Sequence, residues 1–392
     1  MENLLFKEIL AEKDYITELR RKIHTNPEIS MKEFNTTKLI KSELEKYGVE
    51  LVDLDTDIGV LGILRGTAGG EGEVIALRAD IDALPINEKT NLPYQSTSPG
   101  VMHACGHDGH TAILLGTAKV LAKNLDKFSC IVKFIFQPGE EMLSGAKHMI
   151  ERGVLDNPKV DTIVALHAWP FLNAGELGFW KGPYYAGADW FDVNIIGESG
   201  HGAYPHKTKD SLIAATNTVM ALQSIISRQT PAIQNTVVSV CRFNAGTANN
   251  IIPHISNFGG TVRSHSEEVR NGIPAKMEKI IKGVSEAFGC EYEFTYTQGV
   301  SVVDNTPDTV DRMIRGIQKS LGDNSVVPLP EPVMGSEDFA EYGKYVKDSA
   351  IFRLGNTDDE HPVVQMHSEK FNFNDNAIPY GINAFVQFVV NK

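Results

Sequence analysis

The densest group of potential metal ligands in this chain is the segment His103-Ala-Cys-Gly-His-Asp-Gly-His110. It holds three histidines, a cysteine and an aspartate within eight residues, with glycines that relax the backbone. Imidazole and thiolate suit Zn²⁺, Ni²⁺ or Co²⁺, and carboxylates suit harder ions as well. Cys105 and His107 are close enough in sequence to face one ion from a loop. The alternative is a helix start capped by Asp108 or Thr111.

Further side chains of the same kind occur later in the chain. Glu140 and Glu141 follow a Pro-Gly turn. Adjacent carboxylates raise each other's pKa unless a cation intervenes, and a cation would let one bind metal while the other acts as a base. The alternative for this pair is a solvated helix start, favoured by the helix dipole. His167 ends an apolar run, where a histidine is usually satisfied by hydrogen bonds, and His367 has His361 as a local competitor.

Short apolar runs precede these side chains and predict the strands that position them. The runs 74–78, 130–136 and 161–166 predict buried strands, and the patterns at 111–125 and 144–152 predict helices between them. Strand–helix alternation favours an α/β sheet with helices on both faces. Open α/β sheets bind ligands outside the carboxyl ends of their strands. We therefore expect the acids and histidines to lie just past the strand ends, at one edge of the sheet.

Other patterns extend this α/β region towards both ends of the chain. Apolar side chains at helical spacing between charges predict one or two amphipathic helices near the N-terminus. The remaining predicted elements are helices over 3–24, 36–47 and 308–321, a strand over 60–65 and a final helix after residue 379.

The composition changes after Gly182-Pro183. The predicted elements beyond it are a strand (190–196), a helix (209–228), two strands (236–243 and 256–263), a helix (267–288) and a strand (291–297). This order is the β-α-β-β-α-β pattern of ferredoxin-like domains. Because 392 residues are too many for one ordinary core, we expect two domains. They are a discontinuous catalytic, metal-binding domain over 1–184 and 300–392, and an inserted lid and dimerisation domain over 185–299.

The bulk composition excludes several classes of partner. Lys plus Arg number 37 and Asp plus Glu 50, so the net charge is −13, which disfavours nucleic acid and anionic membranes. No apolar window is long enough for a membrane span, and the N-terminus does not resemble a secretory signal. Scattered cysteines favour a reducing compartment, so we expect a cytoplasmic protein. These cysteines are Cys105, Cys130, Cys241 and Cys290.

Taken together, the motifs resemble the M20 metallopeptidase family, specifically its amidohydrolase branch of hippurate hydrolases, N-acyl-amino-acid amidohydrolases and plant auxin-conjugate hydrolases. The resemblance runs from Arg20 to the C-terminus, nearly the whole chain. Its markers are Arg20-Arg-Lys-Ile-His-Thr-Asn-Pro-Glu28, Leu77-Arg-Ala-Asp-Ile-Asp-Ala-Leu-Pro85, Gly100-Val-Met-His-Ala-Cys-Gly-His-Asp-Gly-His-Thr111, Phe136-Gln-Pro-Gly-Glu-Glu141, Gly200-His-Gly-Ala-Tyr-Pro-His206, Asn250-Ile-Ile-Pro253, Gly260-Thr-Val-Arg263 and Met334-Gly-Ser-Glu-Asp-Phe339.

The resemblance implies a site with two divalent ions (Zn, Mn, Ni or Co) and Glu140 as general base. The implied ligands are Cys105, His107, Glu141, His167 and His367. The residues implied to orient ligands are Asp80 and Asp82. The implied oxyanion donor is His201, whose alternative is an ordinary loop histidine between glycines. The implied substrate contacts are Asn250 and Arg263 through their side chains and Gly335 and Ser336 through their backbone.

The function that this resemblance implies is hydrolysis of the amide bond of a small N-acyl amino acid by water activated between two cations. A homodimer or higher homo-oligomer through the inserted domain is also implied. Many relatives have Ala where Gly139 stands before the glutamates, and we expect little consequence because both residues are small. The nearest alternative is a dipeptidase or a metallopeptidase of broader specificity.

Alternatives from other classes remain open. A cysteine hydrolase would use Cys105 as nucleophile, but a thiol nucleophile needs one histidine rather than three. A binding module without activity is disfavoured by the intact Glu140, because a site that only binds does not need a base beside a ligand.

Overall fold

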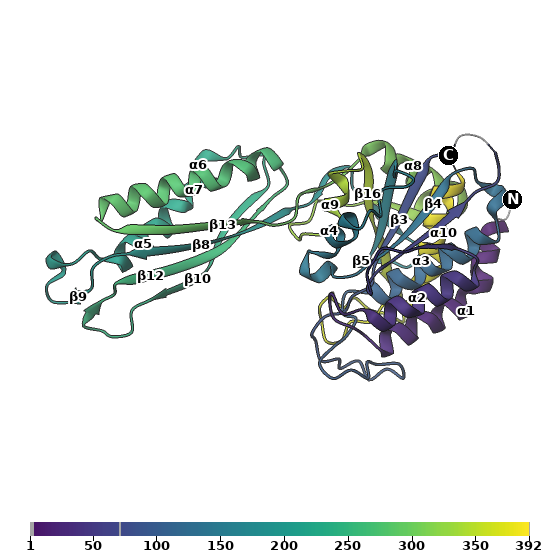
Figure 1. Cartoon of the computed structure of the whole chain (residues 1–392), viewed down its shortest axis with the longest axis horizontal. Coiled ribbons are helices and arrows are strands. Elements are labelled where there is room, and N and C mark those ends of the chain that lie inside the picture. The colour runs from purple at the N-terminus through teal and green to yellow at the C-terminus, as the bar shows by residue number, and fades with distance from the viewer. Residues whose placement is uncertain (1–3, 70–71, 392) are drawn as a thin grey trace. The chain divides into compact units, whose positions relative to one another are not determined.

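The computed structural model describes residues 4–69 and 72–391, and the chain forms two compact units (Figure 1). The first unit comprises Met1–Gly182, Asp304–Glu331 and Asp338–Lys392. The second comprises Pro183–Val303 and Pro332–Glu337. Two excursions of the chain therefore build the second unit, and the first is assembled from three segments.

An eight-stranded mixed sheet organises the first unit, in the order β1-β2-β4-β3-β5-β16-β6-β15. Its central strands β4, β3, β5 and β16 run parallel to one another, whereas β1 and β2 are antiparallel to their neighbours. The α/β fold expected from the sequence is confirmed. The strands are β1 (Glu50–Val52), β2 (Val60–Arg65), β3 (Val74–Asp80), β4 (Ile131–Gln137), β5 (Thr162–Asn173), β6 (Leu177–Phe179), β15 (Val326–Pro328) and β16 (Asp348–Thr357).

Two details of the strand prediction are wrong. Asp80 was expected just past its strand, but it is the last residue of β3. His167 was expected just past the end of its strand, but it lies inside β5, which continues to Asn173. The strand is extended because β16 pairs with it in parallel, with His167 opposite Arg353. The predicted run ends at an apolar residue, whereas the real strand ends where pairing with β16 ends. His167 therefore projects from a rigid sheet rather than from a loop.

The helices of the first unit include one that is almost entirely buried. Fourteen of the 16 residues of helix α3 are buried, as expected for a helix inside a core, and its charged and imidazole side chains lie mainly in the first turn. It packs on β3 and β5, with α1 and α10 beside it. The helices are α1 (Leu4–Thr25), α2 (Phe34–Lys46), α3 (His107–Ala122), α4 (Gly145–Glu151), α8 (Pro307–Leu321), α9 (Ala340–Gly343) and α10 (Ile378–Val390), with short 3₁₀ turns η1 (Leu125–Lys127), η2 (Glu140–Met142), η4 (Asp323–Ser325) and η5 (Asp375–Ala377).

The second unit contains a four-stranded antiparallel sheet in the order β10-β12-β8-β13. Its core lies between this sheet and the helices α5 and α7, around Phe191, Phe258 and Met277. The helix predicted over 209–228 is two helices that meet at Gln223. The elements are β8 (Gly187–Ile196), α5 (Ser211–Leu222), α6 (Ser224–Gln229), β10 (Thr236–Ala245), β12 (Ile255–Ser264), α7 (Glu267–Ala287) and β13 (Glu291–Gln298).

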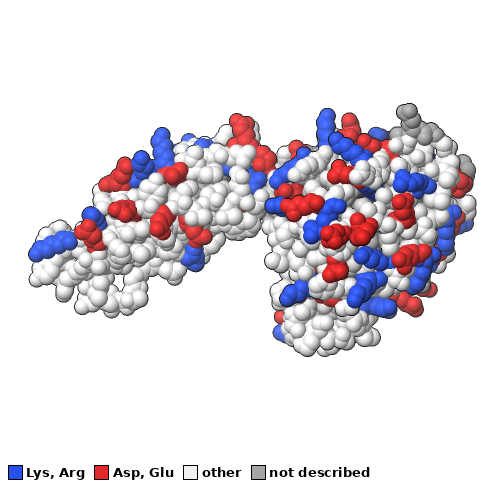
Figure 2. Space-filling view, viewed as in Figure 1, with Lys and Arg blue, Asp and Glu red and all other residues white. Residues whose placement is uncertain are grey.

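Several short elements complete the chain. These elements are β7 (Gly182–Tyr185), β9 (Gly200–His201), η3 (Pro205–Lys207), β11 (Ile251–Ile252) and β14 (Val303–Asn305). Among the described residues, no helix is both long and apolar enough to cross a membrane. Figure 2 shows acidic and basic side chains interspersed over the visible face of each unit.

Candidate metal centre and active site

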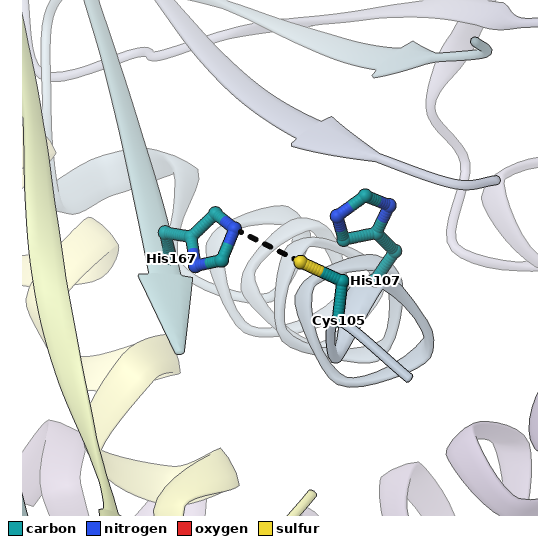
Figure 3. Close-up of side chains that lie close together, drawn as sticks. All are labelled: Cys105, His107 and His167. Carbon is teal, nitrogen blue, oxygen red and sulfur yellow. Dashed lines mark hydrogen bonds between the residues drawn. The ribbon is translucent and has the colours of Figure 1, made fainter. Parts of the chain in front are cut away.

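The turn before α3 brings Cys105 and His107 to the same side of the chain (Figure 3). Gly106 between them has φ 93°, a left-handed conformation that glycine adopts without strain. A Cβ atom at this position would also lie 3.2 Å from the Cβ of Ala168. Glycine is therefore required both for the turn and for the close approach of β5.

All five side chains that the sequence predicts as ligands lie close together in the first unit. Cys105 Sγ is 3.5 Å from His167 Nε2, and Glu141 Oε1 is 3.4 Å from His367 Nε2 and 3.9 Å from His107 Nε2. Ligand atoms about 2.0 to 2.3 Å from a tetrahedral ion are about 3.3 to 3.8 Å apart. These contacts therefore have roughly the spacing of ligand atoms around an ion.

The ligand atoms fall into overlapping groups. Cys105, His107 and His167 form one group whose potential ligand atoms all lie within 4.8 Å of one another, and Cys105, Glu141 and His367 form another. Cys105 belongs to both groups. The arrangement is thus compatible with two neighbouring cations that both lie close to Cys105.

Two of these atoms are buried without a hydrogen-bond partner among the described residues: His107 Nε2 and Glu141 Oε1. Buried polar atoms in proteins are nearly always paired, so an unpaired pair of ligand atoms needs an explanation. A cation between them would satisfy both. The donor set of thiol, imidazoles and carboxylate suits borderline transition metals. On these observations the residues fit divalent metal ions.

The Nδ1 atoms of two histidines predicted as ligands are held by the protein. His107 Nδ1 is 3.0 Å from both Asp82 Oδ1 and the Asp82 carbonyl oxygen. His167 Nδ1 is 2.9 Å from the Ala168 carbonyl oxygen. A hydrogen bond at Nδ1 fixes the ring and leaves the Nε2 lone pair free for a metal. Asp82 thus contacts a ligand directly.

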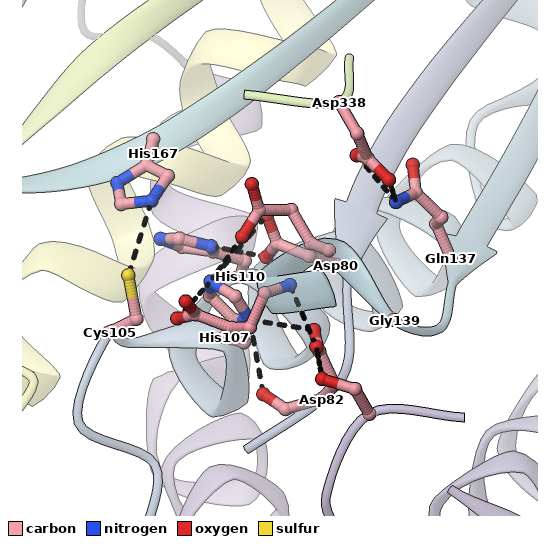
Figure 4. Close-up of polar contacts among 12 residues, drawn as sticks. Asp80, Asp82, Cys105, His107, His110, Gln137, Gly139, His167 and Asp338 are labelled. Carbon is pink, nitrogen blue, oxygen red and sulfur yellow. Dashed lines mark hydrogen bonds and ion pairs between the residues drawn. The ribbon is translucent and has the colours of Figure 1, made fainter. Parts of the chain in front are cut away.

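Asp80 forms a second buried network beside the ligands (Figure 4). Its Oδ1 is 2.6 Å from His110 Nδ1, and its Oδ2 is 2.7 Å from Arg78 Nη1. Burial opposes ionisation of Asp80, but His107, His110 and Arg78 hold its pKa well below the usual range. His110 Nε2 accepts a hydrogen bond from the Ala168 amide at 2.8 Å. Both nitrogens of His110 are therefore engaged within the protein.

The electrostatics of the buried histidines differ sharply. Burial disfavours the charged form of His107, but Asp80 and Cys105 raise its pKa well above the usual range. Burial, together with the neighbouring His110 and Arg353, lowers the pKa of His167 well below its usual range. His167 is therefore neutral and needs to lose no proton to bind a cation, whereas His107 must lose a proton first.

Cys105 and His367 also favour their protonated forms. Burial, and then the charge of Glu141, raise the pKa of the Cys105 thiol. The close contacts with Cys105 and then Glu141 raise the pKa of His367 to about 10. His367 also has φ 63°, an unusual conformation for a residue other than glycine and one that is common at functional sites. Cation binding here must displace protons, so affinity for a metal must fall as the pH falls.

Glu140 lies beside the ligands in the 3₁₀ turn η2. It is buried, and its Oε2 is 3.9 Å from His107 Nε2. Gly139 before it has φ 64°, and a Cβ there would lie 2.6 Å from Met31 Sδ. This geometry argues against our expectation that alanine at position 139 has little consequence in this chain.

Several residues that support the site were missed by sequence reasoning. Asp338 Oδ1 is 3.0 Å from Arg78 Nη2 and accepts a hydrogen bond from Gln137 Nε2 at 2.8 Å, which links β3 and β4. Asp338 Oδ2 accepts from the Ala146 amide at the start of α4. The available signal was Arg78, a charged residue inside an otherwise apolar strand, since buried charges are paired.

The second unit carries the remaining predicted residues. His201 is exposed in β9, paired with Ile251 of β11, and the Gly202 amide donates to the Asn250 carbonyl oxygen at 2.8 Å. Arg263 lies in β12 with its Cζ 5.9 Å from the centroid of the Trp190 ring. The carbonyl oxygen of Gly335 accepts from the Ala186 amide. The roles of His201, Asn250, Arg263 and Gly335 stay predictions.

Comparisons with known proteins bear on this site. Residues 76–391 match the model of peptidase family M20/M25/M40. An N-acyl-L-amino acid amidohydrolase of Geobacillus stearothermophilus is 42% identical over 287 residues, 73% of this chain and 76% of that protein. A hippurate hydrolase of Campylobacter jejuni is 37% identical over 374 residues, 95% of each chain.

A solved structure is similar over nearly the whole chain. It is the YXEP protein of Bacillus subtilis, described as a dinuclear metal-binding peptidase of the M20 family. It superimposes with a TM-score of 0.85 at 33% identity, covering 97% of this chain and 98% of that one. The family predicted from the sequence motifs is therefore confirmed: this chain belongs to peptidase family M20/M25/M40 and is a hydrolase of amide bonds.

Proposed function

We propose that this protein is a metal-dependent amidohydrolase that removes the acyl group from N-acyl amino acids, with Glu140 as general base. One observation carries the proposal: buried atoms of His107 and Glu141 that lack a hydrogen-bond partner within the described residues converge next to a further buried carboxylate. The names of the relatives from Geobacillus stearothermophilus and Campylobacter jejuni support the substrate class. The dinuclear site named for the Bacillus subtilis structure supports two ions.

In the proposed mechanism each residue has one task. The ions (Zn, Mn, Ni or Co) would be held by Cys105, His107, Glu141, His167 and His367. When bound, such ions supply Lewis acidity, which lowers the pKa of water and polarises an amide carbonyl. Glu140 accepts the proton of the attacking water as the new C–O bond forms. As the C–N bond breaks, Glu140 returns this proton to the leaving nitrogen, and the products are a carboxylic acid and a free amino acid.

The second unit completes the proposal. We assign it to a ferredoxin-like lid domain over 185–299, inserted into a catalytic domain over 1–184 and 300–392. His201 would stabilise the oxyanion, and Asn250, Arg263 and Gly335 would hold the substrate. Its β-α-β-β-α-β order of elements supports the fold assignment. A homodimer or higher homo-oligomer and a cytoplasmic location are part of the same proposal.

A second candidate is a dipeptidase or a broader metallopeptidase. It is supported by the description of the Bacillus subtilis structure as a peptidase. Both candidates share the same cations and the same base, and they differ in the group on the amino side of the scissile bond.

A hydrolysis screen of the purified chain tests the proposal. N-acetyl and N-benzoyl amino acids and matched dipeptides are each supplied with Zn²⁺, Mn²⁺, Ni²⁺ or Co²⁺, and with a chelator as control. We expect release of the free amino acid from the acylated substrates, none after chelation, and none from a Glu140→Gln variant that retains its metal. Preference for dipeptides would support the second candidate. Activity that survives chelation would point to Cys105 as a nucleophile and overturn the proposal.

A further inference from the structure

The segment before α2 contacts the turn that carries Glu140. Glu33 is fully buried, and its Oε1 accepts hydrogen bonds from the Gly139 amide at 2.8 Å and from the Met31 amide at 2.9 Å. Glu33 and Met31 lie more than a hundred residues before Gly139 in the sequence. Gly139 immediately precedes the predicted base, so this contact reaches the backbone of the catalytic turn.

The position of Glu33 is not explained by helix capping. Glu33 occupies the N-cap position of α2, but its side chain makes no capping hydrogen bond. The carboxylate of Glu28 accepts hydrogen bonds from the amides of Asn35 and Thr36 instead. Glu28 therefore caps the helix, and the Glu33 side chain is turned inward to Gly139.

Two carboxylates hold the backbone on either side of Glu140. Glu33 accepts from the amide of Gly139, and Asp82 Oδ2 accepts from the amide of Glu141 at 3.0 Å. The same N-terminal segment also reaches Asp82, because Ser30 Oγ donates to Asp82 Oδ2 at 2.6 Å. One segment thus braces both ends of the two-peptide stretch that orients the Glu140 side chain.

Van der Waals contact adds to this brace. Met31, between Ser30 and Glu33, has φ 63°, and its Sδ occupies the space that a Cβ of residue 139 would need. The turn itself is closed by a hydrogen bond from the Leu143 amide to the Glu140 carbonyl oxygen at 2.7 Å. Gly139 therefore has little freedom to shift while the segment is in place.

The arrangement is costly for folding, which indicates a functional reason. Burial, reinforced by the negative charge of Asp82, raises the pKa of Glu33 to about 7. Glu33 Oε2 has no hydrogen-bond partner among the described residues. Burying a carboxyl group that is only partly satisfied costs free energy. An apolar residue at this position would avoid the cost but would leave the Gly139 amide without its acceptor.

We propose that Glu33 is a positioning residue for the general base Glu140. Glu33 fixes the Gly139 amide and hence the peptide that precedes Glu140. This inference rests on the proposed function, because it takes Glu140 to be the base. Reach to the Gly139 amide, rather than negative charge, is what the role requires. Glutamine keeps that reach and loses the charge, whereas aspartate keeps the charge and is one methylene too short.

The test compares Glu33→Gln, Glu33→Asp and Glu33→Ala by kcat, KM and bound metal per chain. We expect kcat of Glu33→Gln within about threefold of wild type. Glu33→Asp and Glu33→Ala should lose about 10- to 100-fold in kcat with KM and metal content nearly unchanged, since small misplacements of catalytic groups cost about this much. Glu28→Ala is the matched control: it should lower the melting temperature through the lost cap and leave kcat unchanged.

The outcomes separate the inference from the proposed function. Kcat of Glu33→Asp at or above that of Glu33→Gln, or all variants within twofold of wild type, would overturn the positioning role. If Glu33→Ala does not fold, the contrast between Glu33→Asp and Glu33→Gln still decides. An active Glu140→Gln would contradict the base assignment itself. With Glu140→Gln inactive, adding Glu33→Asp to it should cause no further loss of the residual rate.

Discussion

Asp108 and His107, neighbours at the start of α3, belong to two different buried polar clusters. The two clusters differ in how their charges are balanced. Asp108 faces a cluster that contains its own cation: Arg20 Nε lies 2.7 Å from Asp108 Oδ2, and His24 Nδ1 lies 2.8 Å from the same oxygen. Burial alone would raise the pKa of Asp108, but Arg20 and His24 hold it far below the usual range. This cluster is neutralised by the chain itself.

His107 faces the other cluster, in which Asp80 is paired with Arg78 but Asp82 and Glu141 have no arginine or lysine partner within the described residues. The ion pairs of Glu141 and Asp82 within the described residues are with histidines, which carry charge only when protonated. An internal guanidinium makes the first cluster a structural feature at all pH values, since arginine stays protonated. The second cluster can be completed only by protons or by metal ions, and this difference distinguishes a buried ion pair from a binding site.

Removal of metal should give the largest effect and affects one cluster only. Dialysis against a chelator should reduce kcat by more than about a thousandfold, because the Lewis acid is lost. Restoring a divalent ion should restore the rate. The measurement is amide hydrolysis with bound metal determined in the same samples. A chelated enzyme that is metal-free and still active would erase the distinction between the clusters.

Substitution in the self-neutralised cluster should affect stability instead. Asp108→Asn leaves the buried Arg20 without its nearest counter-charge, since the distance to Asp375 is longer, at 3.5 Å. Removing one partner of a buried ion pair costs about 3 to 5 kcal/mol. Denaturant unfolding should show this loss, while kcat of the folded, metal-loaded variant stays near wild type. A large loss of kcat without a loss of stability would show that the cluster serves catalysis.

Some of the side chains that the structure brings together in the first unit carry local signals in the sequence. Cys105 and His107 share one short motif, and Glu140 and Glu141 directly follow an apolar run that became β4. His167 was placed correctly near the sheet but wrongly at a strand end. The length of β5 depends on pairing with β16, whose residues are nearly two hundred positions away.

Contacts between distant segments could not be predicted in the same way. Glu33 stands next to Lys32, just before the helix predicted over 36–47, and nothing in the local sequence indicates that its side chain is buried. Its inward orientation depends on Glu28 taking over the cap and on the Gly139 amide lying opposite. Such a choice is made by tertiary packing, which overrides local preference.

Loss of the carboxylate behind a ligand should have an intermediate effect. Asp82→Asn weakens the hold on His107 Nδ1 and on the Glu141 amide. Outer partners of metal ligands typically contribute about 10- to 100-fold in metal affinity or activity. Metal titration and kcat should both show the loss. Ser30→Ala is the milder companion, because it removes one hydrogen bond to Asp82 and keeps the carboxylate. Equal behaviour of Asp82→Asn and wild type would remove Asp82 from the site.

The smallest expected effect tests the turn that carries Glu140. Gly139→Ala places a Cβ in a left-handed conformation, at a cost of about 1 to 2 kcal/mol. It also forces Met31 to move, because the new atom would lie 2.6 Å from Met31 Sδ. Gly48→Ala is the matched control: its φ is 77°, and a Cβ there would have open space around it. Both variants should lose stability, measured as free energy of unfolding, but only Gly139→Ala should also lose kcat, by several fold.

A double variant separates the two causes in that turn. Met31→Ala added to Gly139→Ala opens the space that the new Cβ needs, so that part of the lost kcat should return while the backbone cost remains. Stability and rate would then respond to different contacts of the same glycine. If Gly139→Ala lost stability as Gly48→Ala does but kept its full rate, the packing of Met31 would have no part in orienting Glu140. The hydrogen bond to Glu33 would then have to position the turn alone.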